Sequence, residues 1–229
     1  MKDKIKKIII GIIIFVLYFS FTYIIDFIFN YFNIDLNSWN YWILMVFIFS
    51  LDIVPLVLLM LIYKKDLAND FKIFKLKWKE FADKYIRYWI VGIVLMSLTN
   101  FAISLITSND VGNNEEAVRK ILEVLPIYSI ISTCLCAPIA EELAYRKTLK
   151  NIFNRKWLTI IMSALIFGGA HVIGTYTTIS DILYIIPYGI VGGIFMYIYY
   201  DSKNIWTTIS LHFIHNTILI ITYIISTHL

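Results

Sequence analysis

The sequence has little charge and almost no cysteine. Only 16% of its 229 residues are Asp, Glu, Lys or Arg, whereas about 25% is usual in a soluble domain. Hydrophobic residues make up 59% of the chain, which predicts an integral membrane protein with a single domain over residues 1–229. The two cysteines, Cys134 and Cys136, are one residue apart within an apolar run. This spacing argues against both a disulfide framework and a zinc-binding cysteine motif.

Three further signals are missing. The chain starts with basic residues and continues with an apolar stretch from Ile8 to Ile25, but no small-residue cleavage site follows. We therefore interpret this stretch as an uncleaved transmembrane helix rather than a signal peptide. A GxSxG motif, which would indicate a serine nucleophile, does not occur, and neither does the HExxH motif of zinc peptidases.

Long apolar runs dominate the rest of the chain. A spanning helix needs about 20 mostly apolar residues, and seven segments meet this description: 8–29, 41–63, 88–106, 121–141, 157–174, 182–200 and 205–226. The strands of a membrane barrel would instead alternate between apolar and polar residues. The sequence thus predicts an all-α fold, a polytopic transmembrane helix bundle, with its first three helices within residues 1–106.

The basic residues lie on one side of this seven-helix path. All but two of the 20 Lys and Arg residues fall in four places that alternate along it: the N-terminal tail, 64–87, 146–156 and Lys203. This asymmetry predicts a multi-pass cell-membrane protein with a cytoplasmic N-terminus and an external C-terminus. Contact with anionic lipid then explains the net charge, so no nucleic-acid partner is expected. Aromatic residues among the lysines of 64–87 indicate that this segment lies along the membrane surface.

Several ionisable residues interrupt the apolar spans, where a charge costs about 2.5–3.5 kcal/mol at the bilayer centre. Asp26 and Glu123 fall near the outer ends of their predicted helices, where water can solvate them. Asp52 lies mid-helix, three residues before Pro55. We expect it to pair with another helix or to bond backbone groups that the proline frees. The remaining ionisable residues form three clusters.

The first cluster is Glu141-Glu142-Leu-Ala-Tyr-Arg146. Glu142 and Arg146 are four positions apart, so they can form an ion pair on one face of a helix. Glu141 lies about 100° further round the helix and points elsewhere. A desolvated carboxylate without a counter-charge is suited to act as a general base. Taken alone, the cluster could equally be a helix end whose charges are solvated near the cytosol.

The second cluster is Phe167-Gly-Gly-Ala-His171, in which the glycines allow close helix approach. The third ends in His212-Phe-Ile-His-Asn216, in which His212 and Asn216 lie four positions apart on one face. By itself His171 could be a core histidine, and the His212–Asn216 pair could serve interhelical hydrogen bonding.

One shared site explains the three clusters more economically than three separate packing roles. In such a site, Glu141 and His171 would hold and deprotonate a water molecule. His212 and Asn216 would donate hydrogen bonds to the oxyanion of an attacked amide. The residues therefore predict a hydrolase that has no covalent nucleophile.

These motifs resemble those of the CAAX-protease and bacteriocin-processing intramembrane peptidases, the Abi or CPBP family. That family carries EExxxR, FxxxH and HxxxN or HxxxD on successive transmembrane segments. This chain has Glu141 to Arg146, Phe167 to His171 and His212 to Asn216 in the same order. The resemblance covers about residues 121–220, which would form the catalytic core.

The resemblance implies that Glu141 and His171 activate the water and that His212 and Asn216 form the oxyanion hole, with Glu142 and Arg146 supporting the site. Members of the family that the chain resembles are often called metalloproteases. Glu141, His171 and His212 could supply three ligands to a catalytic zinc ion. His215 is not a motif position and receives no role.

The predicted spans leave one difficulty. Glu141 ends the span 121–141, whereas His171 comes late in the span 157–174, so the two residues would differ in depth by roughly 20 Å. Glu141 and His171 can share one site only if one of these helices starts or ends at another residue than predicted. We therefore predict that segment 146–160 forms a cytosolic helical extension and that the cavity opens toward the cytosol.

The expected function is an intramembrane endopeptidase that acts on a peptide or a membrane-protein substrate in the lipid bilayer. The many lysines, isoleucines and asparagines look bacterial, and the resemblance then implies peptide processing or bacteriocin self-immunity. Two alternatives stay open from the sequence. One is a non-catalytic immunity or scaffold protein of the same fold, and the other is a small transporter whose Glu and His residues carry protons.

Overall fold

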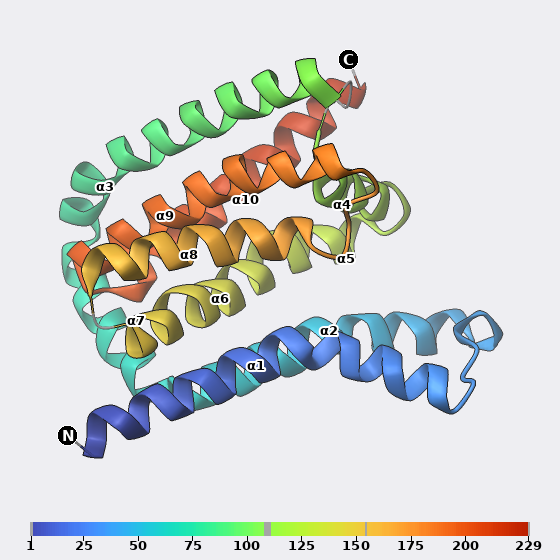
Figure 1. Ribbon diagram of the computed structural model, residues 1–229, viewed down its shortest axis with the longest axis horizontal. Helices are drawn as coiled ribbons and strands as arrows, with labels where there is room; N and C mark the ends of the chain where they lie inside the picture. Colours follow the sequence, from blue (N-terminus) through green and yellow to red (C-terminus); the bar gives the residue numbers. More distant parts are fainter. Residues whose placement is uncertain (1, 108–110, 154, 229) are drawn as a thin grey trace.

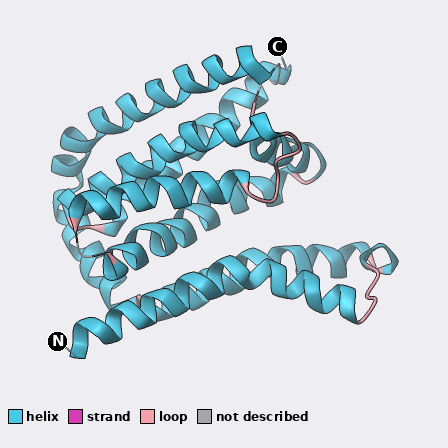
Figure 2. Ribbon diagram, in the orientation of Figure 1, coloured by secondary structure: helices cyan, strands magenta, loops and turns pink. Residues whose placement is uncertain are grey.

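The computed structural model describes residues 2–107, 111–153 and 155–228, and every regular element in these ranges is helical (Figures 1 and 2). The first half comprises α1 (Lys2–Tyr31), the short turn η1 (Leu36–Ser38), α2 (Tyr41–Ile62), α3 (Lys64–Thr107) and α4 (Asn113–Val124). One continuous segment follows, formed by α5 (Pro126–Ile131), η2 (Ser132–Cys136), α6 (Ala137–Glu141), η3 (Glu142–Thr148) and α7 (Leu149–Ile152). The chain ends with α8 (Lys156–Val172), η4 (Ile179–Tyr184), α9 (Ile185–Ser202) and α10 (Ile205–His228). The predicted all-α helix bundle is confirmed.

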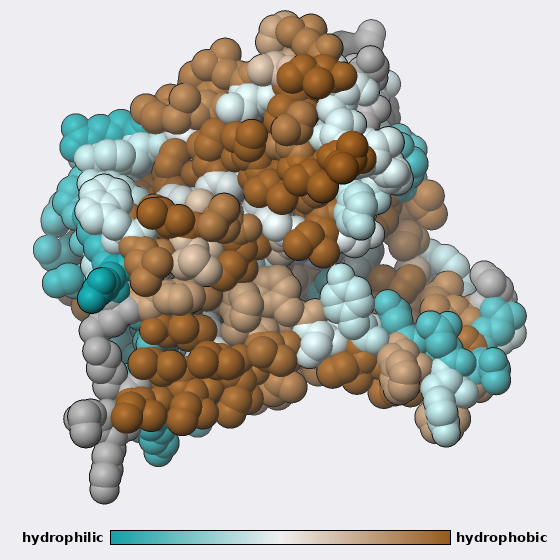
Figure 3. Space-filling model, in the orientation of Figure 1, coloured by the Kyte–Doolittle hydropathy of each residue, from teal (hydrophilic) through white to brown (hydrophobic). Residues whose placement is uncertain are grey.

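The helices are suited to a membrane. Among the described residues, six helical segments are long and apolar enough to cross it, within Ile5–Tyr31, Tyr41–Ile62, Lys64–Thr107, Pro126–Ile152, Ile179–Ser202 and Ile205–Thr227. The remaining predicted span, 157–174, corresponds to α8, which is apolar but has only 17 residues. Apolar side chains cover the middle of the face in Figure 3, and polar ones gather toward its ends. The chain is therefore a multi-pass membrane protein.

The segment 64–87 and the predicted span 88–106 form one helix, α3, of 44 residues. In Figure 1 the teal first part of α3 crosses one end of the bundle, and the green part runs along the other helices. Asn204 Nδ2 donates to the carbonyl of Asp70 at 2.6 Å, and Trp206 Nε1 donates to the carbonyl of Leu67 at 2.9 Å. These bonds attach the first part of α3 to the turn between α9 and α10.

The helical segment that carries the first motif does not match its predicted bounds of 121–141. It starts at Pro126 and continues to Ile152, while α4 is a separate helix before it. Two stretches of π-helix, η2 and η3, lie on either side of α6. Pro138 contributes to the irregularity because it has no N–H to donate to the preceding turn. Such π segments are frequent at functional sites.

The predicted cytosolic extension 146–160 is wrong. The helix stops at Ile152 and α8 begins at Lys156, while Arg146 is completely buried inside the bundle. The predicted difference in depth between Glu141 and His171 disappears, because the helix continues beyond Glu141 and places this residue roughly 16 Å from the helix end. Glu141 therefore sits within the bundle, and the site can close without an extension.

Glycine allows α8 and α9 to pack closely. A Cβ atom at Gly168 would lie only 2.4 Å from the backbone oxygen of Ile185, so no larger residue fits without moving a helix. A Cβ atom at Gly169 would meet only the Ile173 side chain, at 3.6 Å. Of the two glycines from which close helix approach was predicted, Gly168 is therefore the one that lets α8 approach α9 closely.

The α1–α2 hairpin packs beside the rest of the bundle. Its helices contact η2, α6, η3 and α7, whereas its outer half diverges from the other helices in Figure 1. Asp52 of α2 connects the two parts, because its Oδ2 accepts from the Tyr128 hydroxyl at 2.8 Å and from the Ser132 hydroxyl at 2.6 Å. The prediction that Asp52 pairs with another helix is confirmed.

Candidate active site

Glu142 and Arg146 form the centre of the first cluster. Both side chains are fully buried, and Arg146 Nε lies 3.2 Å from Glu142 Oε2. Arg146 Nη1 also donates to the Ser163 hydroxyl at 2.9 Å, and the guanidinium lies over the Phe167 ring at 4.7 Å. The predicted ion pair is confirmed. The alternative of a helix end with solvated charges is excluded, since neither side chain is exposed.

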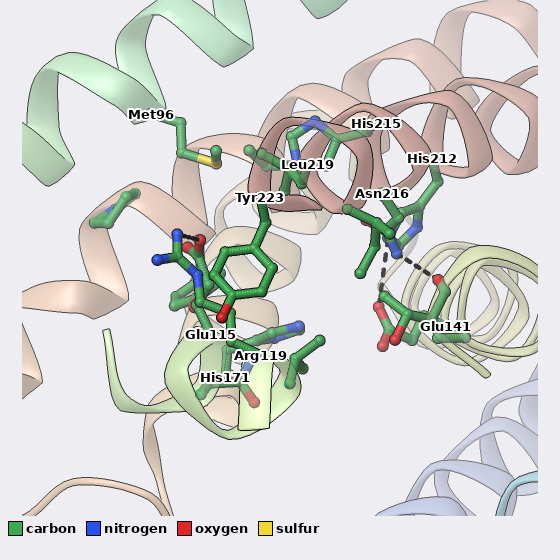
Figure 4. Close-up of a pocket in the computed structure, with 18 of the residues that line it drawn as sticks. Met96, Glu115, Arg119, Glu141, His171, His212, His215, Asn216, Leu219 and Tyr223 are labelled. Atoms are coloured by element: carbon green, nitrogen blue, oxygen red, sulfur yellow. Dashed lines mark hydrogen bonds and ion pairs between the residues drawn. The ribbon is translucent and has the colours of Figure 1, made fainter. Parts of the chain in front are cut away.

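His212 connects both glutamates of the first cluster. Its Nδ1 lies 3.0 Å from Glu142 Oε1, and its Nε2 lies 3.7 Å from Glu141 Oε2. A carboxylate can only accept, so the Nδ1–H of His212 donates this hydrogen bond to Glu142. Nε2 is then the ring atom directed at Glu141, as Figure 4 shows. Glu142 therefore fixes the orientation of the imidazole, in the way that carboxylates orient histidines at many reactive sites.

Glu141 is the last residue of α6, between the two π stretches. Its side chain keeps 17% of its surface exposed. Its Oε2 is buried and accepts no hydrogen bond from any residue that the structure describes. An acceptor in this state is available to a water molecule or to a substrate proton.

Asn216 lies one turn beyond His212 on α10. Its Nδ2 donates to the carbonyl of Thr133 at 2.8 Å, and Thr133 belongs to the π stretch η2. This bond uses one of the two amide hydrogens, so the other can serve a second acceptor. His212 and Asn216 thus share a face of α10, as predicted from their spacing.

His171 comes from α8 and lies on another wall of the site. Its Nδ1 is 2.8 Å from the carbonyl of Phe167, which makes Nδ1 the donor and leaves Nε2 without a proton in the neutral ring. The ring stacks on Tyr188 with the centroids 4.8 Å apart. Phe167 lies between the two histidines, with its centroid 4.3 Å from His171 and 6.2 Å from His212.

All four predicted catalytic side chains line one cavity of about 280 Å³: Glu141, His171, His212 and Asn216. The closest partner of Glu141 among the two imidazoles is nevertheless His212, which the sequence had paired with Asn216. The arrangement is that of a small polar site within an apolar bundle, with a carboxylate from α6, an imidazole from α8, and an imidazole and an amide from α10.

The cavity extends away from the basic end of the bundle. Its other lining residues include Asn114, Glu115 and Arg119 of α4 and Tyr223 near the end of α10. The prediction that the cavity opens toward the cytosolic, basic end is therefore wrong for this cavity. Sequence reasoning missed the residues of α4 because they precede the predicted span 121–141.

His215 is a further lining residue that the motif left out. It is buried, with 6% of its surface exposed, and Nδ1 has no hydrogen-bond partner among the residues described. Figure 4 shows it on a different side of α10 from His212. Its place three positions after His212 was the only sequence signal for this location.

The three candidate zinc ligands only partly fit a metal site. His171 and His212 each have Nδ1 occupied by an acceptor, which leaves Nε2 for a metal, as is usual for ligating histidines. However, no group of three His, Cys, Asp or Glu side chains within the described ranges lies close enough together to hold a metal ion. As arranged, Glu141, His171 and His212 do not form a three-ligand zinc site.

Comparisons with known proteins match the segment that carries the three motifs. Residues 123–218 match the family model described as type II CAAX prenyl endopeptidase Rce1-like, and this segment contains every motif residue named above. This segment of the chain is therefore similar to the CAAX-protease family. A similar protein is the putative membrane peptidase YdiL of Bacillus subtilis strain 168, which is 27% identical over 111 residues. The match covers 47% of this chain but only 42% of YdiL, and no solved structure matches.

Proposed function

We propose that the protein is an intramembrane endopeptidase in which Glu141 activates a water molecule for attack on a peptide bond. One observation carries this proposal: a carboxylate whose buried oxygen accepts no hydrogen bond from the described residues shares a small cavity with His171, His212 and Asn216. Such a set supplies a general base and oxyanion donors without a covalent nucleophile. The family model that residues 123–218 match supports the same class of reaction.

In the proposed reaction, Glu141 and His171 hold the water, and Glu141 takes one of its protons as the oxygen attacks the carbonyl carbon. The carbonyl oxygen becomes an oxyanion, which accepts hydrogen bonds from the free amide N–H of Asn216 and from Nε2–H of His212 in its doubly protonated form, whose Nδ1–H still donates to Glu142. When the C–N bond breaks, the proton on Glu141 passes to the leaving amine. Glu142 and Arg146 orient His212 and do not touch the substrate.

No step above passes through zinc. If zinc does take part, Glu141, His171 and His212 are the residues that would hold it, and the metal would lower the pKa of its bound water. Because these three residues do not converge as arranged, we expect the purified protein to keep its activity after dialysis against EDTA. Loss of activity that zinc restores would instead assign them as ligands.

The mechanism is tested by peptide cleavage with the purified full chain. A defined peptide mixture is incubated with the protein in lipid nanodiscs, and products are identified by mass spectrometry. Replacing Glu141 by Gln preserves shape but removes the base, so kcat/KM should fall by about 10²–10⁴-fold. Asn216→Ala should lower kcat by about 10²–10³-fold with little change in KM. Asp26→Asn, an exposed change on α1, is the control. Wild-type rates in Glu141→Gln would refute the mechanism.

We further propose that the cellular role is bacterial peptide processing or bacteriocin self-immunity, as the resemblance implies. The membrane peptidomes of cells carrying the wild type and Glu141→Gln should differ in peptides cleaved only by the wild type. A non-catalytic immunity protein would protect cells equally well with either form. Equal protection at equal protein levels would therefore favour the non-catalytic alternative.

A further inference from the structure

A second cavity lies on the opposite side of Glu141 from His212. It has a volume of about 710 Å³, within the range of about 300–1,000 Å³ that is usual for small-ligand sites. The α1–α2 hairpin forms one wall, and α6, η3 and α8 form the other. Figure 3 shows the molecule hollowed between the hairpin and the rest of the bundle. Ala137 and Glu141 line both cavities, so the two spaces are separated by little more than one side chain.

The second cavity is rich in aromatic rings. Tyr145 is buried at its base, and the ring of Phe19 lies edge-on to it at a centroid distance of 5.4 Å. The ring of Tyr18 also packs edge-on against the Tyr145 ring, at a centroid distance of 6.2 Å. Phe15, Phe21 and Tyr23 complete the aromatic lining. The faces of such rings attract cations electrostatically.

Asp52 gives the second cavity a carboxylate of its own. Both hydroxyl donors, Tyr128 and Ser132, reach Oδ2, and no donor among the described residues reaches Oδ1. None of the lining residues is Lys, Arg or His, and no described cation pairs with Asp52. A carboxylate inside a membrane is commonly paired with an opposite charge, and no cation among the described residues takes that place beside Asp52. Carboxylate and aromatic rings together make the cavity complementary to a positive charge.

We propose that this second cavity is a subsite that binds the basic side chain, of lysine or arginine, of the peptide substrate. The inference rests on the proposed function, because it takes the scissile bond to lie in the first cavity beside Glu141. Since Glu141 lines both spaces, a peptide bound at the first cavity can extend a neighbouring side chain into the second. The aromatic rings cover the apolar stem of that side chain, and Asp52 pairs with its charged end.

The first test measures binding without cleavage. Two dansyl-labelled pentapeptides are compared that differ only at the central residue, arginine or its neutral analogue citrulline. They are titrated against the full chain in zwitterionic nanodiscs, in a Glu141→Gln background that prevents cleavage and removes the other charge. The arginine peptide should bind at least about tenfold more tightly than the citrulline peptide. Asp52→Asn should abolish this difference, while the exposed Asp26→Asn should not.

Asparagine is the appropriate replacement at Asp52 because it can still accept from the hydroxyls of Tyr128 and Ser132. An unchanged thermal transition will show that the variant is folded. Equal binding of the two peptides to the chain with Asp52 intact, as expected if a lipid chain occupies the cavity, would overturn the proposal. A preference for arginine that survives Asp52→Asn would overturn it as well.

The second test uses the cleavage sites that the wild type selects from the peptide mixture. Lys or Arg should be enriched at one fixed distance from the scissile bond, and the enrichment should return to background in Asp52→Asn. Cleavage by the wild type without such enrichment refutes the subsite but leaves the peptidase intact. If the wild type cleaves nothing, the proposed function fails, and the arginine–citrulline comparison still decides whether the cavity binds a basic side chain.

Discussion

Glu141 and Glu142 are adjacent in sequence but lie in opposite electrostatic surroundings. Glu142 is completely buried between Arg146 and His212, which supply a cation and a ring N–H. Glu141 is partly exposed, faces two cavities, and has an oxygen that accepts no hydrogen bond from the described residues and lies 3.7 Å from His212 Nε2. Because an unpaired buried charge is costly, the first environment suits a structural carboxylate and the second a reactive one.

The buried pair leads to a prediction about stability. Arg146→Met would leave Glu142 in the bundle without its cation, and losing one partner of a buried ion pair costs about 3–5 kcal/mol. We expect a much lower thermal transition in detergent and little protein in the membrane. Adding Glu142→Gln to this variant should recover part of the lost stability, because the uncompensated charge is removed. Equal stability of Arg146→Met and the wild type would show that the pair contributes nothing.

The pairing of residues was only partly predictable. Sequence spacing was sufficient to predict the pair Glu142 and Arg146, because residues four apart in a helix are neighbours on its surface. It was insufficient for His212, which lies 70 residues from Glu142 yet contacts it directly. Which imidazole approaches Glu141 depends on how α10 is rotated against α6, and periodicity within one helix carries no information about that rotation.

At the level of elements, the existence of the spans was predictable and their ends were not. Apolar runs of suitable length located the six described segments that are long enough to cross a membrane, because burial in lipid requires such runs. The bounds of the segment Pro126–Ile152 were missed because its last turns contain Glu142, Arg146 and Lys147, which look like residues outside a membrane. They are tolerated there since the first two pair with each other, and Lys147 pairs with Asp66 at 3.1 Å.

The contact between α8 and α9 gives a prediction with an internal control. Gly168→Ala would put a methyl group 2.4 Å from the Ile185 carbonyl oxygen, so the helices must separate. We expect a loss of about 1–3 kcal/mol, which is usual for overpacking. Gly169→Ala meets only the flexible Ile173 side chain at 3.6 Å and should be neutral or stabilising by up to about 1 kcal/mol, since alanine favours helices. Unfolding of the purified variants in detergent compares them, and an equal loss at both positions would contradict the packing argument.

At the scale of the whole molecule, the positions of the termini depend on α8. The N-terminus and the C-terminus lie at opposite ends of the bundle in Figure 1, which agrees with the predicted cytoplasmic start and external end. This arrangement requires α8 to cross the membrane, although its 17 residues extend over only about 26 Å and a bilayer core is about 30 Å thick. A short helix can cross where the surrounding lipid thins or where its neighbours shield its ends.

Single cysteines test this crossing directly. Cys134 and Cys136, which are both buried, are first replaced by alanine so that each variant carries a single cysteine. Ile179→Cys, at an 87% exposed position just after α8, should react with a membrane-impermeant maleimide in intact cells. Glu80→Cys, an exposed position on the first part of α3, should react only after the membrane is permeabilised. If α8 failed to cross, Ile179→Cys would also need permeabilisation, and the predicted orientation of everything that follows α8 would be reversed.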